Sequence, residues 1–251
     1  MVLVNKVCII TGASEGIGEA IAKTLAVDGK CCTVLASRQI DKLNLLVEKL
    51  HAAGCAKGNV IAIKCDITKK EDVQHVYEIA IEKYGKVDIL VNCAGIMYYT
   101  MMKNLHVDEW EKEINVNCHG TLNMIGAVLP HFIEHKQGHI VNITSDVGKR
   151  GFAGLAVYSG TKFYLEGFSQ SLRQEVAEYN VKITNIQPGE VATKLADKST
   201  DQEARNKYEA CQAGYKVLDP EDVARAVLFV LSQPAHVAVN EILIQPRAAP
   251  F

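Results

Sequence analysis

Short runs rich in valine and isoleucine alternate with stretches of helical length along the whole 251-residue chain. Seven such runs occur, at residues 6–12, 32–37, 60–67, 87–95, 139–145, 182–189 and 241–246. Because their apolar content is nearly continuous, we expect strands that are buried on both faces, as in a parallel sheet. The alternation predicts one α/β domain over residues 1–251, a doubly wound, mostly parallel seven-stranded sheet with helices on both faces.

The composition is that of a globular protein, with 48% hydrophobic and 22% charged residues. The formal net charge of −2 gives no basic footprint for nucleic acid. No apolar run reaches the ~18–20 residues that a membrane span needs. Residues 1–12 carry one lysine and no small-residue cleavage site, so they indicate a first strand and not a signal peptide. We therefore expect a cytoplasmic protein without a membrane span.

The cysteines are interpreted as reduced thiols of the core. None of the eight forms a C-x-x-C pair, and no histidine lies at zinc-ligand spacing from them, so no metal site is expected. Most of them sit in apolar stretches, where a free cysteine behaves as a small hydrophobe. They are Cys8, Cys31, Cys32, Cys55, Cys65, Cys93, Cys118 and Cys211.

Residues 190–218 are the least regular part of the chain, polar and without a clean strand pattern. A helix start follows, with Asp219 as N-cap, Pro220 at the first helical position and Asp222 in the first turn. A long irregular segment in a compact fold favours a functional, substrate-binding loop, although short helices are an alternative.

A glycine-rich turn, TGASEGIG, follows the first run and contains Gly12, Gly16 and Gly18. Glycines in this position allow a tight turn and a close approach of backbone to a pyrophosphate, which the N-terminus of the next helix attracts. Three glycines within seven residues also occur in ordinary loops. The preceding strand and the following helix favour a dinucleotide-binding role.

Four further residues have the chemistry of proton transfer. Tyr158 and Lys162 lie four residues apart in an expected helix and so share one face. A nearby ammonium group lowers the pKa of a phenol from ~10 towards the neutral range. Ser145 ends the fifth run, at the sheet edge where α/β folds bind ligands. Asn117 sits mid-helix, where asparagine is unfavourable unless it has a function or bonds to backbone.

Together, T-G-x-x-x-G-x-G, N-x-A-G (92–95), Asn117, Ser145, Y-x-x-x-K and Pro188-Gly189 resemble the short-chain dehydrogenase/reductase family. Their order and spacing hold from residue 6 to residue 246. The resemblance implies a Rossmann-type fold and an oxidoreductase that acts on a small alcohol or carbonyl substrate. It also implies that Tyr158 is the acid/base, Ser145 positions the carbonyl, Lys162 assists Tyr158, and Asn117 keeps a water in the proton relay.

The resemblance further assigns residues to the cofactor. Thr193 matches the position that anchors the nicotinamide carboxamide, Asp66 the acidic residue beside the adenine, and Lys162 the residue that holds the nicotinamide ribose. Cys93 and Thr144 depart from the common pattern without an expected effect on chemistry. The implied cofactor-binding residues are Gly12, Ser14, Gly16, Ile17, Gly18, Ser37, Arg38, Asp66, Asn92, Ala94, Gly95, Tyr158, Lys162, Pro188, Gly189, Val191 and Thr193.

The end of the second run favours NADP(H) over NAD(H). An acidic residue there would bond the ribose 2′-hydroxyl and repel a 2′-phosphate, but the run ends in Ser37-Arg38. A guanidinium pairs with the phosphate bidentately and stacks on adenine. Glu15, in the glycine-rich turn, acts against NADP(H) only if it points inward; at a helix start it complements the dipole instead.

The substrate is less constrained. The C-terminal residues 236–251 resemble NADP-dependent 3-hydroxy acid and farnesol-type alcohol dehydrogenases, while a carbonyl reductase for steroid, acyl-chain or xenobiotic ketones and a non-catalytic NADP(H) sensor are alternatives. Lys149 and Arg150 either meet a substrate carboxylate or form a solvated turn. Met97, Tyr98, Met101 and Met102 either line an apolar pocket or pack a loop. The resemblance implies a homotetramer or homodimer with the long helices expected near residues 108–134 and 155–179 at its interface.

Overall fold

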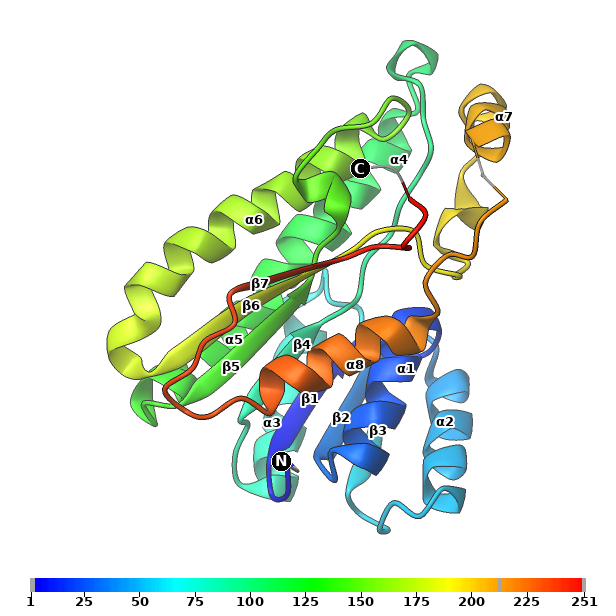
Figure 1. Ribbon diagram of the computed structural model, residues 1–251. Helices are drawn as coiled ribbons and strands as arrows, with labels where there is room; N and C mark the ends of the chain where they lie inside the picture. Colours follow the sequence, from blue (N-terminus) through cyan, green and yellow to red (C-terminus); the bar gives the residue numbers. More distant parts are fainter. Residues whose placement is uncertain (1–2, 212–213, 250–251) are drawn as a thin grey trace.

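The computed structural model describes residues 3–211 and 214–249, and Figure 1 shows one twisted sheet with helices on either side. Within these residues the sheet has seven strands, all parallel, in the order β3-β2-β1-β4-β5-β6-β7. The predicted doubly wound sheet is confirmed. The strands are β1 (Val7–Thr11), β2 (Cys32–Ser37), β3 (Val60–Lys64), β4 (Ile89–Asn92), β5 (Gly138–Ile143), β6 (Val181–Pro188) and β7 (Glu241–Ile244).

Two apolar cores cover the two faces of the sheet, because consecutive strand residues point to opposite sides. Cys8 and Ile10 of β1 belong to the first core, and Ile9 between them belongs to the second. The first core holds α1 (Gly16–Lys23), α2 (Ile40–Ala52) and α8 (Pro220–Leu231). The second core holds α3 (Lys70–Tyr84), α5 (Thr121–Glu134) and α6 (Ala156–Val176), and α4 (Val107–Ile114) packs on α6.

The helix expected over residues 108–134 is interrupted. A π-helical turn, Asn115–Gly120, lies between α4 and α5. Gly120 lies against Ile67, since a Cβ at this glycine would come within 2.6 Å of that side chain. Such π-turns often occur at functional sites. This one carries Asn117 inward, and the asparagine is buried.

Residues 190–218 contain short helices, the alternative considered above. A 3₁₀ turn (Leu195–Lys198) and α7 (Gln202–Cys211) lie beyond the end of β6, and Figure 1 shows α7 standing apart from the sheet. A bridge between Val191 and Leu218 closes the base of this excursion. The capping box of Asp219 and Asp222 then starts α8 with Pro220 in its first turn, as predicted.

The seven cysteines whose side chains are described are free thiols, and most are buried. Cys211 lies outside the residues whose side chains are described. None of the helices in residues 3–211 and 214–249 combines the length and the apolar character that crossing a bilayer requires.

Candidate active site

A cavity of about 1160 Å³ opens at the carboxyl ends of the central strands. Ligands of open α/β sheets bind in this position. The glycine-rich turn and the end of β2 line one end, which we call the glycine-turn end. The other end, which we call the substrate end, is lined by Met97, Tyr98, Tyr99, Met101, residues 152–155, Ala204, Lys207, Tyr208 and Tyr215. Tyr158 and Lys162 contribute to the wall of the same cavity.

The glycine-rich turn brings backbone against backbone. Gly12 has φ +67°, and a Cβ there would lie 2.8 Å from the Cα of Ala94. A Cβ at Gly18 would lie 2.2 Å from the carbonyl oxygen of Gly12. The Oγ1 of Thr11 accepts hydrogen bonds from the amides of Cys93 and Ala94, both at 3.1 Å. The turn is therefore held tightly to the end of β4, with the N-terminus of α1 directed at the cavity.

The end of β2 presents a polar corner. Ser37 Oγ donates to Ser14 Oγ at 2.9 Å, and exposed Arg38 lines the cavity beside them. Glu15 forms an ion pair with Lys42, at 2.6 Å from its Nζ, and this pair lowers the pKa of the carboxyl group. Its charge is thus balanced from the solvent side, a different partner from the helix dipole expected above.

Asp66 follows β3 and lines the cavity near Arg38. Its Oδ1 accepts from the amide and the hydroxyl of Thr68, at 3.1 and 2.7 Å. Burial acts to raise its pKa, but these hydrogen bonds and the nearby Arg38 charge lower it overall. Asp66 is therefore an ionised acceptor at the cavity edge.

The predicted catalytic side chains converge on the cavity wall. Tyr158 is buried on α6, and the Nζ of Lys162 lies 5.5 Å from its ring centroid. That Nζ also donates to the carbonyl oxygen of Ile143 at 3.0 Å. Ser145 follows β5 and hydrogen-bonds Tyr158, which lowers the pKa of the phenol. Its Oγ also donates to Asp146 Oδ1 at 3.1 Å.

The pKa of Tyr158 differs from the expectation drawn from the sequence. Burial raises it above the ordinary value of a phenol, and this effect exceeds the lowering by Ser145. Burial also lowers the pKa of Lys162 to about 8. Desolvation disfavours the charged form of both Tyr158 and Lys162. The i,i+4 spacing alone therefore did not predict that burial outweighs the attraction between the two groups.

Asn117 lies behind this wall and does not line the cavity. Its Oδ1 accepts from the amide of Ile96 at 2.9 Å, and its Nδ2 donates to the Ile96 carbonyl oxygen at 2.9 Å. Nδ2 also donates to Thr161 Oγ1 at 3.2 Å, and Thr161 belongs to α6. Asn117 thus joins the loop after β4 to the helix of Tyr158. The water-holding role implied above stays a prediction.

Most of the predicted cofactor residues line the cavity, with one exception. Asn92 is buried in the sheet, where its Nδ2 donates to Asn142 Oδ1 at 2.9 Å, and it does not reach the cavity. Asn92 is the last residue of β4, and the segment directly after it carries the lining residues Ala94 and Gly95. Those in the lining are Gly12, Ser14, Gly16, Ile17, Gly18, Ser37, Arg38, Asp66, Ala94, Gly95, Tyr158, Lys162, Pro188, Gly189, Val191 and Thr193.

The basic turn after Ser145 points away from the cavity. Lys149 Nζ lies 2.7 Å from Glu241 Oε2 and 3.6 Å from Glu166 Oε2. Arg150 covers the ring of Phe152 at 4.7 Å from its centroid. Neither basic residue is part of the cavity lining, whereas Phe152 is. Lys149 is therefore not positioned to contact a substrate carboxylate in the cavity.

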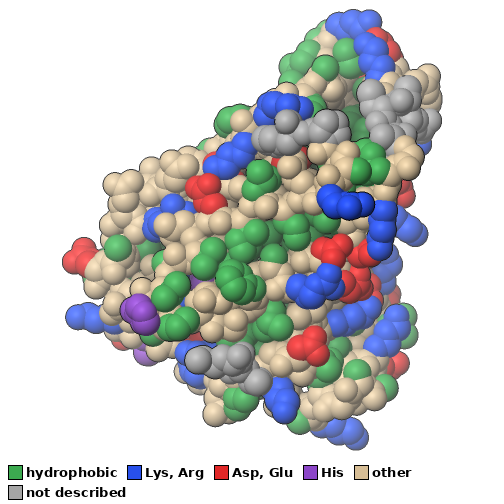
Figure 2. Space-filling model, viewed as in Figure 1, with side chains coloured by type: hydrophobic (Ala, Val, Ile, Leu, Met, Phe, Trp, Pro, Cys, Tyr) green, Lys and Arg blue, Asp and Glu red, His purple; other side chains and the backbone are tan. Residues whose placement is uncertain are grey.

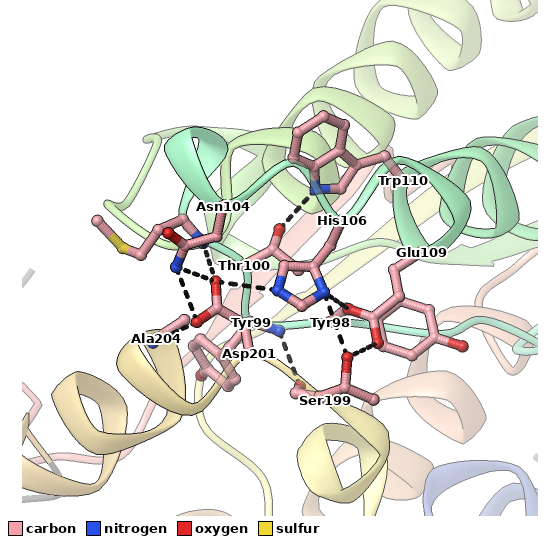
Figure 3. Close-up of polar contacts among 12 residues, drawn as sticks. Tyr98, Tyr99, Thr100, Asn104, His106, Glu109, Trp110, Ser199, Asp201 and Ala204 are labelled. Carbon is pink, nitrogen blue, oxygen red and sulfur yellow. Dashed lines mark hydrogen bonds and ion pairs between the residues drawn. The ribbon is translucent and has the colours of Figure 1, made fainter.

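The segment after β4 roofs the substrate end. Met97, Tyr98 and Met101 line the cavity, which is one of the two alternatives predicted for them, whereas Met102 is exposed. Figure 3 shows how residues 98–110 are tied to residues 199–204. Among these ties, Asp201 Oδ2 accepts from the amide of Met101 and Ser199 Oγ accepts from the amide of Tyr99, both at 2.8 Å.

Sequence patterns did not indicate Asp146 or three lining residues of the excursion, Glu190, Tyr208 and Tyr215, and they named Thr11 only as part of the glycine-turn motif. Thr11 is recognisable in the sequence because it directly precedes the first glycine of the turn. Glu190 lies inside the Pro188–Val191 stretch and was passed over. Nothing in the spacing of the two tyrosines indicates that they return to the cavity.

Comparison with known proteins agrees with this geometry. The short chain dehydrogenase profile matches residues 6–204. The chain is 46% identical over 249 residues to glycine betaine reductase ATRR of Emericella nidulans. That match covers 99% of this chain and only 19% of the length of that relative.

Two solved structures share the whole fold. The closed form of a serine dehydrogenase complexed with NADP⁺ matches with a TM-score of 0.87 and 30% identity, over 98% of this chain and 96% of that one. An alcohol dehydrogenase from the archaeon Thermococcus sibiricus, complexed with 5-hydroxy-NADP, matches with a TM-score of 0.85 and 28% identity over 98% of both chains.

Proposed function

The chain belongs to the short-chain dehydrogenase family of oxidoreductases, and we propose that it interconverts an alcohol and its carbonyl compound with NADP(H). The observation that carries the proposal is that one cavity is lined by the glycine-rich turn, Ser145, Tyr158 and Lys162. A dinucleotide site and a proton donor thereby share one space. In this reading, residues 190–218 form the substrate-binding segment.

The glycine-turn end fits NADP(H). The turn has no room for a side chain at Gly12 or Gly18, so the amides at the start of α1 are available to a pyrophosphate. Ser37 and Arg38 provide donors and a positive charge for a 2′-phosphate. Glu15 also lines the cavity, and its ion pair with Lys42 offsets the negative charge that would oppose a 2′-phosphate. The two solved structures described above contain NADP⁺ and an NADP derivative, which supports the same choice.

NADP(H) supplies the hydride, and the chain positions the substrate and moves the proton. Tyr158 is protonated at neutral pH, since burial raises its pKa, so it serves as the acid that protonates the alkoxide during carbonyl reduction. Ser145 donates to the carbonyl oxygen. Lys162 supports the developing phenolate by its charge, Thr193 anchors the carboxamide, and Asn117 holds a water of the proton relay.

The substrate class is proposed from similarity to known proteins. The similar structures are named as an alcohol dehydrogenase and a serine dehydrogenase, in keeping with a hydroxy compound such as a 3-hydroxy acid or farnesol-type alcohol. Glycine betaine, in the name of the 46% identical relative, is a quaternary ammonium compound. Reduction of steroid, acyl-chain or xenobiotic ketones, and cofactor sensing without turnover, are the alternatives.

We also propose that the protein is a homo-oligomer. Figure 2 shows hydrophobic side chains gathered over α8 and the edge strand β7, where Phe229 is 53% exposed and Leu243 is 45% exposed. On α6, Phe163 is 46% exposed. Sedimentation equilibrium tests this proposal, and a monomer at micromolar concentration refutes it.

The activity is tested by the change in nicotinamide absorbance. NADPH and NADH are each offered with a panel of ketones, aldehydes and 3-oxo acids, and the oxidised cofactors with the matching alcohols. We expect turnover with NADPH that Tyr158→Phe abolishes while NADPH still binds. Tyr164→Phe, which removes an exposed hydroxyl from the same helix, is the control. Full turnover in Tyr158→Phe refutes the mechanism.

A further inference from the structure

We propose that the substrate end of the cavity selects a cationic substrate, an alcohol or carbonyl compound that carries an ammonium or quaternary ammonium group. This inference rests on the proposed function and narrows it, because it disfavours the carboxylate-bearing substrates considered above. Two carboxylates and a wall of aromatic rings carry the argument.

Glu190 places its carboxylate at the substrate end. Its Oε1 accepts from the hydroxyl of Tyr208 at 3.3 Å and its Oε2 from the hydroxyl of Tyr215 at 3.0 Å. Both tyrosines also line the cavity, and both are half-buried. Neutral donors thus orient the carboxylate without balancing its charge.

Asp146 adds a second carboxylate to the lining. Its Oδ1 accepts from Ser145 Oγ and its Oδ2 from Gln245 Nε2, each at 3.1 Å. Among the residues that the structure describes, no lysine, arginine or histidine forms an ion pair with Asp146 or Glu190. These two carboxylates therefore make the potential at this end of the cavity more negative.

The basic groups of the lining do not cancel this potential. Lys207 is the lysine closest in sequence to Tyr208, but its side chain is 60% exposed and pairs with Glu203 at 3.4 Å. Lys194 and Lys198 follow Thr193, which contacts the position of a Cβ on Gly16 and so belongs to the glycine-turn end. The Nζ of Lys162 is held at the catalytic wall.

Aromatic rings and thioethers form the rest of the substrate end. The rings of Tyr99 and Tyr208 stack with centroids 4.0 Å apart, and Figure 3 shows Tyr99 in the roof segment beside Asp201. Phe152, Met97 and Met101 complete this wall. Aromatic faces attract cations, and quaternary ammonium groups, which have no N–H to donate, are recognised in this way.

An apolar wall by itself suits a neutral substrate equally well, so the carboxylates decide between the two. A neutral group that displaces water from Glu190 leaves a desolvated carboxylate with two neutral donors and no counter-charge, which costs free energy. A cation in the same place removes that cost and gains attraction from both acids. A substrate carboxylate is repelled.

The test uses two isosteric aldehydes with NADPH, betaine aldehyde and 3,3-dimethylbutanal, which differ in a charged nitrogen or a neutral carbon at the branch point. We expect kcat/KM to favour the cation at least tenfold. Glu190→Gln reduces that preference about tenfold, mainly through KM for the cation. Asp197→Asn, which removes one exposed acid from the same excursion outside the lining, leaves the preference unchanged.

Equal kcat/KM for both aldehydes in the wild type overturns the inference and leaves the proposed function intact. An equal loss for both aldehydes in Glu190→Gln also overturns it, because Glu190 then only holds Tyr208 and Tyr215. If neither aldehyde reacts, calorimetry with choline and 3,3-dimethylbutan-1-ol on the NADP⁺-loaded protein decides. Tighter binding of choline that Glu190→Gln abolishes supports the inference, and equal or absent binding refutes it.

Discussion

Replacement of Gly18 by alanine tests the claim that the glycine-rich turn is packed backbone against backbone. The added Cβ would lie 2.2 Å from the Gly12 carbonyl oxygen and 2.7 Å from the Gly12 carbonyl carbon. Ordinary contacts of a Cβ begin near 3.4 Å. To lie 3.4 Å instead of 2.2 Å from the Gly12 carbonyl oxygen, the added Cβ requires the turn to move away from α1 by about 1.2 Å.

Two consequences of this displacement can be measured. Overpacking of a tight contact costs about 1–3 kcal/mol of unfolding free energy, which urea denaturation detects. A shift of about 1 Å in a binding element costs up to about 100-fold in function, so we expect NADPH affinity to fall by about 10- to 100-fold in a fluorescence titration.

Gly126→Ala is the matched control. Gly126 lies in α5, and a Cβ there meets nothing within 4 Å. Alanine in a helix interior with free space stabilises by about 0.5–1 kcal/mol, so this variant should be as stable as the wild type or more so, with NADPH affinity unchanged. A Gly18→Ala protein with wild-type urea midpoint and wild-type NADPH affinity refutes the packing argument.

Two other substitutions test the charges of the cavity. Arg38→Ala should weaken NADPH binding by about tenfold or more and NADH binding much less, because both cofactors lose stacking on adenine but only NADPH loses the partner of its 2′-phosphate; equal losses for both cofactors in titrations contradict this. Burial lowers the pKa of Lys162 to about 8 from 10.5, so the unfolded state binds more protons between these values and stability should rise with pH across that window. The stability gained by Lys162→Met over the wild type should therefore shrink by about 2 kcal/mol from pH 7 to pH 9.5 in urea denaturation, and a constant difference refutes the lowered pKa.

The sheet was predictable because its signal is local and repeated. Each strand is buried on both faces, so each appears in the sequence as an apolar run, and the family motifs place the turn and the catalytic helix along the chain. The interruption at Asn115–Gly120 was not predictable, since a π-turn keeps the composition of a helix. The burial that raises the pKa of Tyr158 was also hidden, because i,i+4 spacing defines a neighbour but not the surrounding dielectric.

The charge of the substrate end shows why nearness in sequence misleads. Lys149 and Arg150 follow Ser145 closely, and on the sequence they suggest a partner for a substrate carboxylate. In the fold, Lys149 pairs with Glu241, 92 positions further along the chain, and so turns away from the cavity. The substrate end instead contains Glu190, which follows β6. Each of its carboxylate oxygens accepts a hydrogen bond from a tyrosine hydroxyl of the excursion. Glu190 and Asp146 line the cavity without an ion-pair partner among the described residues, and they favour a cationic substrate where the basic turn had suggested a carboxylate.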